Sequence, residues 1–184
     1  MARIIWGITG SGDRIEEILN NMIDLKEEPN LMITVIVSKA GEQVFRRYNL
    51  WDRLNSTFNK VKKETNANVP FVAGPLQIGR YDLLIVAPLT ANSTAKIAHG
   101  IADTLITNAV AQTLKGTTPV ILYPVDQTND PVTTVGPDGI EFTITARDVD
   151  LDNVDRLKNM NGVSILESPS LIVQVVRKHL HSTT

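Results

Sequence analysis

Short runs of branched apolar residues, separated by segments with helical spacing, restrict the fold of this chain more than any other feature. Four such runs stand out, at residues 4–8, 31–38, 82–88 and 118–125. Strands that are apolar on both faces are typical of parallel sheets covered by helices on each side. The alternation therefore predicts an α/β fold, with a doubly wound, mostly parallel sheet in a three-layer α/β/α arrangement.

The rest of the chain is expected to follow this rhythm with one interruption. Residues 69–72 are a candidate third strand, and helices are expected from about Asp13, after residue 38, within 90–115, at 149–160 and at 168–179. Residues 126–147 are rich in turn formers and then alternate, which predicts a hairpin or an edge strand, and we take this segment as an excursion from the domain. With 184 residues and 42% hydrophobic composition, we expect one domain over 1–184.

Charge and cysteine content exclude several classes of function. The net charge of −2 gives no general attraction to nucleic acid or to an anionic membrane. The chain has no cysteine, so disulfides, thiolate-bound metals and cysteine nucleophiles are excluded. No apolar run reaches the roughly 18 residues of a membrane span, and the amino-terminal residues lack a signal-peptide pattern. We expect a cytoplasmic protein with neither nucleic-acid nor membrane partners, and we assign no metal site.

The stretch GITGSG, residues 7–12, lies between the first strand and the first helix. Backbone N–H groups of Thr9, Gly10 and Ser11 at such a turn favour an anion, although a tight turn capped by Asp13 is the alternative. The spacing is not that of the dinucleotide motif G-x-G-x-x-G, and the second strand ends in Ser38 and Lys39 rather than in an acidic residue. A mononucleotide phosphate is favoured; alternatively, Ser38 only caps a helix and Lys39 is solvated.

The segment APLTANSTAKIAHGIADTLITN, residues 87–108, carries a resemblance to a known family. It is similar to the P-A-S-A-N-T segment of homo-oligomeric FMN-binding flavoproteins, which include cysteine decarboxylases and flavin prenyltransferases. Together with GITGSG and the end of the second strand, the resemblance spans about residues 1–125. It implies a flavodoxin-like (Rossmann-like) sheet, FMN as cofactor, the phosphate near the first two loops with Lys39 as counter-charge, and the ring near residues 90–92. The implied cofactor-binding residues are Thr9, Gly10, Ser11, Ser38, Lys39, Pro88, Thr90, Ala91, Asn92 and Asp103, although Asp103 has a capping role as its alternative.

Two departures from that family bear on the reaction. The decarboxylases carry a histidine before the strand at 82–88, but residues 72–82 contain none. The family's P-x-M-N segment is here Pro124-Val125-Asp126-Gln127, and Asp126 and Gln127 are candidates for contact with a second substrate. Cysteine decarboxylation is therefore disfavoured, and we assign no catalytic residue from the sequence.

The opening RIIWGITGSGD and the later DVDLDNVDRLKNMNGVSIL, residues 148–166, resemble archaeal flavoproteins that include dihydromethanopterin reductases. This resemblance implies an FMN-dependent oxidoreductase that accepts electrons from a ferredoxin or an iron–sulfur flavoprotein. Its acceptor would be a small molecule, with a pterin as one candidate. It also implies a homo-oligomer, as a trimer or a multiple of trimers. The alternatives are an FMN-dependent transferase or lyase, and a regulatory relative that has lost catalysis.

Two aromatic residues are open to two interpretations. Tyr48 and Trp51, expected at the end of the second helix, either cover the flavin of a neighbouring subunit or pack on the surface of that helix.

Overall fold

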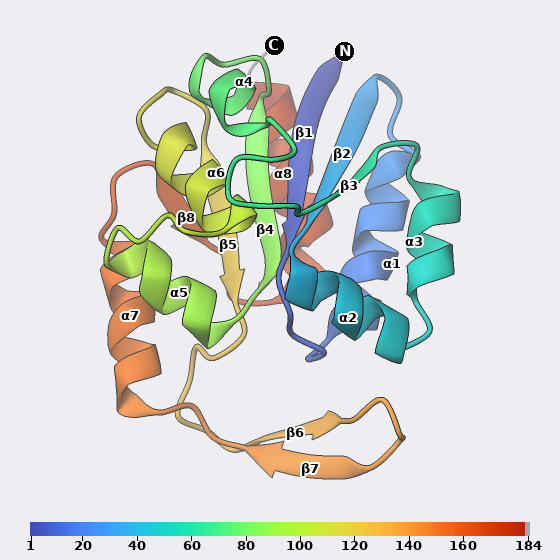
Figure 1. Cartoon of the computed structure of the whole chain (residues 1–184), viewed down its shortest axis with the longest axis vertical. Helices are drawn as coiled ribbons and strands as arrows, with labels where there is room; N and C mark the ends of the chain where they lie inside the picture. Colours follow the sequence, from blue (N-terminus) through green and yellow to red (C-terminus); the bar gives the residue numbers. More distant parts are fainter. Residues whose placement is uncertain (183–184) are drawn as a thin grey trace.

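The computed structural model describes residues 1–182 and has a six-stranded parallel sheet at its centre (Figure 1). The spatial order of the strands is β3-β2-β1-β4-β5-β8. After β1 the chain adds β2 and β3 toward one edge of the sheet, and it then adds β4, β5 and β8 toward the other edge. The direction in which strands are added therefore reverses between β1 and β4. The strands are β1 Ala2–Ile8, β2 Leu31–Val37, β3 Val61–Lys63, β4 Leu83–Leu89, β5 Val120–Pro124 and β8 Val163–Ile165.

Helices cover both faces of this sheet, as the alternation of strands and helices predicts (Figure 1). Side chains alternate across β1, so that Trp6 and Ile8 join one apolar core while Ile5 joins the other. Helices α1 and α8 pack together on the first face, and α4 and α6 pack together on the second. The three-layer, doubly wound α/β class is therefore confirmed. The helices are α1 Ile15–Lys26, α2 Lys39–Arg47, α3 Trp51–Thr57, α4 Ala73–Gln77, α5 Ala91–Ala98, α6 Leu105–Thr113, α7 Asp148–Lys158, the 3₁₀ turn η1 Pro169–Leu171, and α8 Ile172–Ser182.

The third strand lies elsewhere than the sequence pattern indicates. Val61–Lys63 pairs with β2, whereas residues 69–72 lead from an isolated bridge at Val69 into α4. The prediction was wrong because β3 is a three-residue strand at the edge of the sheet and is only partly buried, so it lacks an apolar run. Tyr48 and Trp51 likewise do not end one long helix, since Asn49, at φ 56°, separates α2 from α3.

Residues 126–147 leave the sheet and contain a separate antiparallel hairpin. Strands β6 Val132–Val135 and β7 Glu141–Ile144 pair with each other and lie crosswise below the central sheet in Figure 1. Gly139 allows the turn between them, since its φ of 80° strains any residue with a Cβ. The Tyr48 hydroxyl donates a hydrogen bond of 3.0 Å to the carbonyl oxygen of Val135. Tyr48 thus attaches the hairpin to α2 of its own chain.

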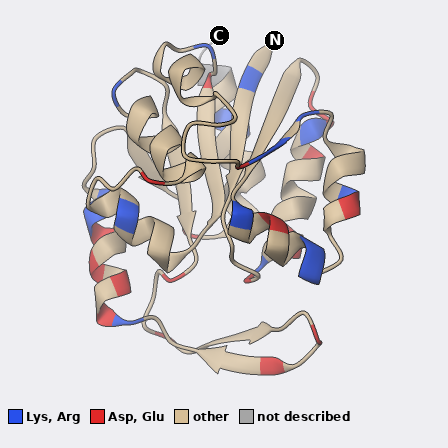
Figure 2. Cartoon of the chain, viewed as in Figure 1, with Lys and Arg blue, Asp and Glu red and all other residues tan. Residues whose placement is uncertain are grey.

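Charged side chains of both signs are mixed over the helices, while the hairpin carries few (Figure 2). Within 132–144 the charged residues are Asp138 and Glu141. Across residues 1–182, every helix is too short or too polar to cross a lipid bilayer.

Candidate functional site

The loops after β1 and β4 are joined at the point where the strand order reverses. The Thr9 hydroxyl donates to the carbonyl oxygen of Pro88 at 2.8 Å and accepts from the Thr90 N–H at 2.9 Å. The Thr9 N–H also donates to the Pro88 carbonyl, at 3.2 Å. Thr9 is only 2% exposed, so its hydroxyl serves to hold the two loops together. Parallel α/β sheets bind ligands in the crevice at such a reversal.

A cavity of about 600 Å³, called the main cavity below, lies at this reversal. Its size is within the range of small-molecule and cofactor sites. Seven of the residues predicted to bind a cofactor line it: Thr9, Gly10, Ser38, Lys39, Thr90, Asn92 and Asp103. Loops that are far apart in the sequence therefore meet around one space.

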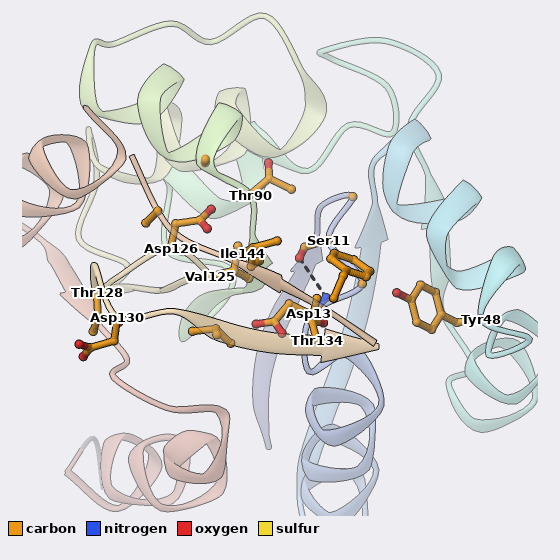
Figure 3. A pocket seen from close by; sticks show the side chains of 16 residues that line it. Ser11, Asp13, Tyr48, Thr90, Val125, Asp126, Thr128, Asp130, Thr134 and Ile144 are labelled. Atoms are coloured by element: carbon orange, nitrogen blue, oxygen red, sulfur yellow. Dashed lines mark hydrogen bonds between the residues drawn. The ribbon is translucent and has the colours of Figure 1, made fainter. Parts of the chain in front are cut away.

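A second cavity, of about 290 Å³, separates the loop after β1 from the β6–β7 hairpin, and we call it the hairpin cavity (Figure 3). Gly10 and Thr90 line both cavities, so the two adjoin. Ser11 and Ala91, also predicted to bind a cofactor, line the hairpin cavity. Pro88 lines neither cavity, and it contributes through the carbonyl oxygen that Thr9 contacts.

Ser38 caps α2. Its Oγ accepts a hydrogen bond of 2.9 Å from the N–H of Gly41, which was the alternative left open for this residue. Lys39 is exposed at the rim of the main cavity, while its backbone N–H donates to Glu64 Oε2 at 3.0 Å. The alternative interpretation of the loop after β1, a tight turn capped by Asp13, was wrong, because Arg14 is the N-cap of α1.

Asp103 also lines the main cavity, and its carboxylate is in an ion pair. Its carboxylate accepts from Lys96 Nζ at 2.8 and 2.9 Å, which connects the loop before α6 to α5. The next residue, Thr104, caps α6 in a reciprocal arrangement with Thr107. Asp103 therefore borders the cavity as an exposed carboxylate paired with Lys96.

The loop after β1 approaches α2 so closely that only glycine fits at position 10. A Cβ on Gly10 would lie 2.6 Å from the Cβ of Ala40. This contact keeps the loop against the first turn of α2, where Ser38 and Lys39 border the main cavity. Gly10 thus sets the distance between two walls of the site.

Three aspartates, Asp13, Asp126 and Asp130, line the hairpin cavity, and the pKa values of the first two are shifted (Figure 3). Burial raises the pKa of Asp13, and a hydrogen bond with the Thr134 side chain partly opposes that rise. Burial also raises the pKa of Asp126, and the nearby charges of Asp150 and Asp13 raise it further while Arg147 lowers it. The cavity therefore holds groups that bind protons more readily than exposed carboxyls do.

Asp126→Asn is expected to raise the thermal stability at neutral pH and to leave it unchanged at pH 3. Because the folded-state pKa of Asp126 is raised, the stability that this group contributes is present below its ordinary value of 3.8 and is lost as the pH rises through the folded-state value. Removing the buried charge should therefore shift Tm upward by about 1–3 °C at pH 7. Thermal melts at both pH values test this, with the exposed Asp152→Asn as the control. A Tm gain of equal size at pH 3 would contradict the assignment.

Two residues that line these cavities, Glu64 and Thr134, were not predicted from the sequence. Glu64 follows the very short β3, and Thr134 lines the hairpin cavity together with Tyr48, which the sequence offered only as a cover for the flavin of a neighbouring subunit or as surface packing. Of the two residues predicted to contact a second substrate, Asp126 lines the hairpin cavity. The Gln127 amide instead donates to the carbonyl oxygens of Pro124 and Leu166, at 2.8 and 2.7 Å. Gln127 therefore connects β5 to the end of β8.

Comparison with known proteins shows which family this chain belongs to. An uncharacterized protein of Methanocaldococcus jannaschii is 47% identical over 180 residues, covering 98% of this chain and 97% of that protein. Dihydromethanopterin reductase (acceptor) of Methanosarcina mazei is 30% identical, covering 94% of this chain and 98% of that protein. The crystal structure of Burkholderia xenovorans DmrB in complex with FMN, described as a cubic protein cage for redox transfer, is 30% identical with a TM-score of 0.84, covering 99% of this chain and 97% of that one. The model of the Flavoprotein family matches residues 1–182, and the chain belongs to this family.

Proposed function

We propose that this chain is an FMN-dependent oxidoreductase that receives electrons from an iron–sulfur protein and passes them to a small acceptor of the dihydropterin class. The observation that carries the proposal is the meeting of the predicted cofactor loops around the main cavity at the β1/β4 reversal. The names of relatives that align over nearly the whole chain support it. Bound FMN would supply reversible uptake of electrons, and the protein would bind and orient it.

The residues present fit FMN. Ser38, Lys39 and the loop at Gly10 offer a hydroxyl, an ammonium group and backbone N–H groups near one another, which suits one phosphate. Thr90, the N-cap of α5, and Asn92 in the first turn of that helix line the same cavity, where their polar groups suit the edge of a flat ring. Asp103 is paired with Lys96, which partly offsets the repulsion between its carboxylate and an anionic ligand.

The hairpin cavity supplies a place for the acceptor next to the cofactor. It adjoins the main cavity at Gly10 and Thr90 and is lined by the apolar side chains of Val132, Phe142 and Ile144 together with Asp13 and Asp126. Such a mixture of apolar walls and a few polar groups suits a planar heterocycle such as a pterin. We further propose that the chain assembles as a trimer or a multiple of trimers, as the cage formed by the Burkholderia protein suggests.

The transferase or lyase alternative has less support from this site. Its decarboxylase form needs a histidine beside the ring, but in the part of the chain that the structure describes neither cavity is lined by one. The His99 ring contacts Asn153 Oδ1 at 3.1 Å, and the His179 ring contacts the carbonyl oxygen of Asp82 at 2.9 Å. Both histidines therefore have structural contacts away from the proposed cofactor site.

Anaerobic visible spectroscopy of the purified protein tests the proposal. We expect a bound flavin that is released as FMN, bleaches when reduced ferredoxin is added, and regains its colour when a dihydropterin is supplied. A flavin that ferredoxin does not reduce would overturn the electron-transfer proposal in favour of the transferase alternative. Protein that binds no FMN, even after incubation with it, would overturn both.

A further inference from the structure

Glu64 is fixed at the edge of the sheet and lines the main cavity. Its backbone N–H donates to the carbonyl oxygen of Val37 at 2.8 Å, which continues the β2–β3 pairing by one residue. The side chain is therefore carried by the sheet rather than by a free loop. Its carboxylate is held at the carboxyl end of β3, beside the loops that form the site.

The two oxygens of this carboxylate contact two different helices. Oε2 accepts a hydrogen bond of 3.0 Å from the N–H of Lys39, and Oε1 accepts one of 2.7 Å from the N–H of Leu105. These N–H groups belong to the first residues of α2 and α6, each nine residues long. Each helix brings a partial positive charge to this point, where proteins commonly bind phosphate. Here the anion that fills the position belongs to the chain itself.

Ser38 and Thr104, the N-caps of these helices, do not accept hydrogen bonds from the N–H groups that Glu64 contacts. Their hydroxyl groups accept hydrogen bonds from Gly41 and Thr107, two residues further into each helix. The N–H groups that Glu64 satisfies would otherwise be open to the main cavity. A ligand phosphate near Ser38 would therefore lie beside the negative carboxylate of Glu64, which already occupies the N–H groups of Lys39 and Leu105.

We propose that Glu64 is a specificity-determining residue that restricts the main cavity to ligands with a single phosphate. It occupies the helix-terminus position that a second phosphate would need, so a mononucleotide is accepted and a pyrophosphate is repelled. The inference rests on the proposed function in that it takes the main cavity as the FMN site. It predicts that this chain binds FAD and other dinucleotides more weakly than FMN.

Glu64→Ala tests the proposal in the full-length protein freed of flavin. Removing the carboxylate should open an anion position between α2 and α6, so inorganic phosphate should raise the Tm of the variant by about 3 °C more than that of the wild type at equal ionic strength. Glu42→Ala is the matched control, because the carboxylate of Glu42, which lies on α2, is also paired but contacts Arg46 and Lys63 instead of helix N–H groups. It should show the wild-type response to phosphate.

Flavin selectivity provides the second measurement. The ratio of the FAD Kd to the FMN Kd should fall by about ten-fold or more in Glu64→Ala, and the Glu42→Ala ratio should not change. If Glu64→Ala does not fold, Glu64→Gln removes the charge while keeping the shape, and its ratio should fall in the same direction. A folded variant with neither a phosphate response nor a changed ratio would overturn the proposal. The phosphate measurement uses no flavin, so it separates failure of this inference from failure of the FMN assignment.

Discussion

Gly10→Val is expected to abolish FMN binding at micromolar concentrations while leaving a folded protein. A Cβ at this position would lie 2.6 Å from the Cβ of Ala40, and valine adds two further methyl groups. The loop after β1 must then move away from α2, which separates the backbone N–H groups of the loop from Ser38 and Lys39. We expect the Kd for FMN to rise by about 100-fold or more, equivalent to about 3 kcal/mol.

The cost in stability should be smaller than the cost in binding. Overpacking of this kind costs about 1–3 kcal/mol, so the variant should still melt cooperatively. Gly74→Ala is the matched control, because nothing lies within 4 Å of a Cβ built there. Fluorescence titration of FMN measures the affinity, and circular dichroism checks the fold. Tight FMN binding by a folded Gly10→Val protein would show that the loop is not a wall of the cofactor site.

Thr9→Val should destabilise the protein by about 1–3 kcal/mol and weaken FMN binding together. Valine has nearly the shape of threonine, but it leaves the Thr90 N–H without its acceptor and removes one donor to the Pro88 carbonyl. Since Thr9 is 2% exposed, water is poorly placed to replace these hydrogen bonds. The loss connects stability to function, because the same bonds hold the β1 and β4 loops at the site.

Thr9→Ser restores the hydroxyl and should recover most of both losses. The measurements are Tm, expected to fall by about 3–10 °C in Thr9→Val, and the Kd for FMN. A Thr9→Val protein with normal stability but lost binding would point instead to direct contact between the hydroxyl and the ligand. That result would remove the loop-joining role assigned to Thr9.

The contacts seen for these residues explain why the loops that line the cavities could be predicted while the contacts of individual side chains could not. GITGSG and the P-A-S-A-N-T-like segment predicted which loops line a cavity, because strand ends in a parallel sheet meet at one edge. Yet Thr9 joins loops, Ser38 caps a helix, and Asp103 pairs with Lys96. Hydroxyl and carboxyl groups serve such structural roles as readily as ligand contacts, and only their neighbours in space distinguish the two.

The sequence by itself determined the fold class, because buried Ile- and Val-rich runs at the spacing of strand and helix are a local property of the chain. It also located the hairpin segment at 126–147 through its turn formers. The tertiary structure decided the position of β3, the hydrogen bonds of Glu64 to two helix ends and the lining of the hairpin cavity by Tyr48 and Thr134. Each of these depends on residues brought together from distant positions: a three-residue edge strand has no periodicity to read, and two helix ends that converge on one carboxylate leave no pattern along the chain.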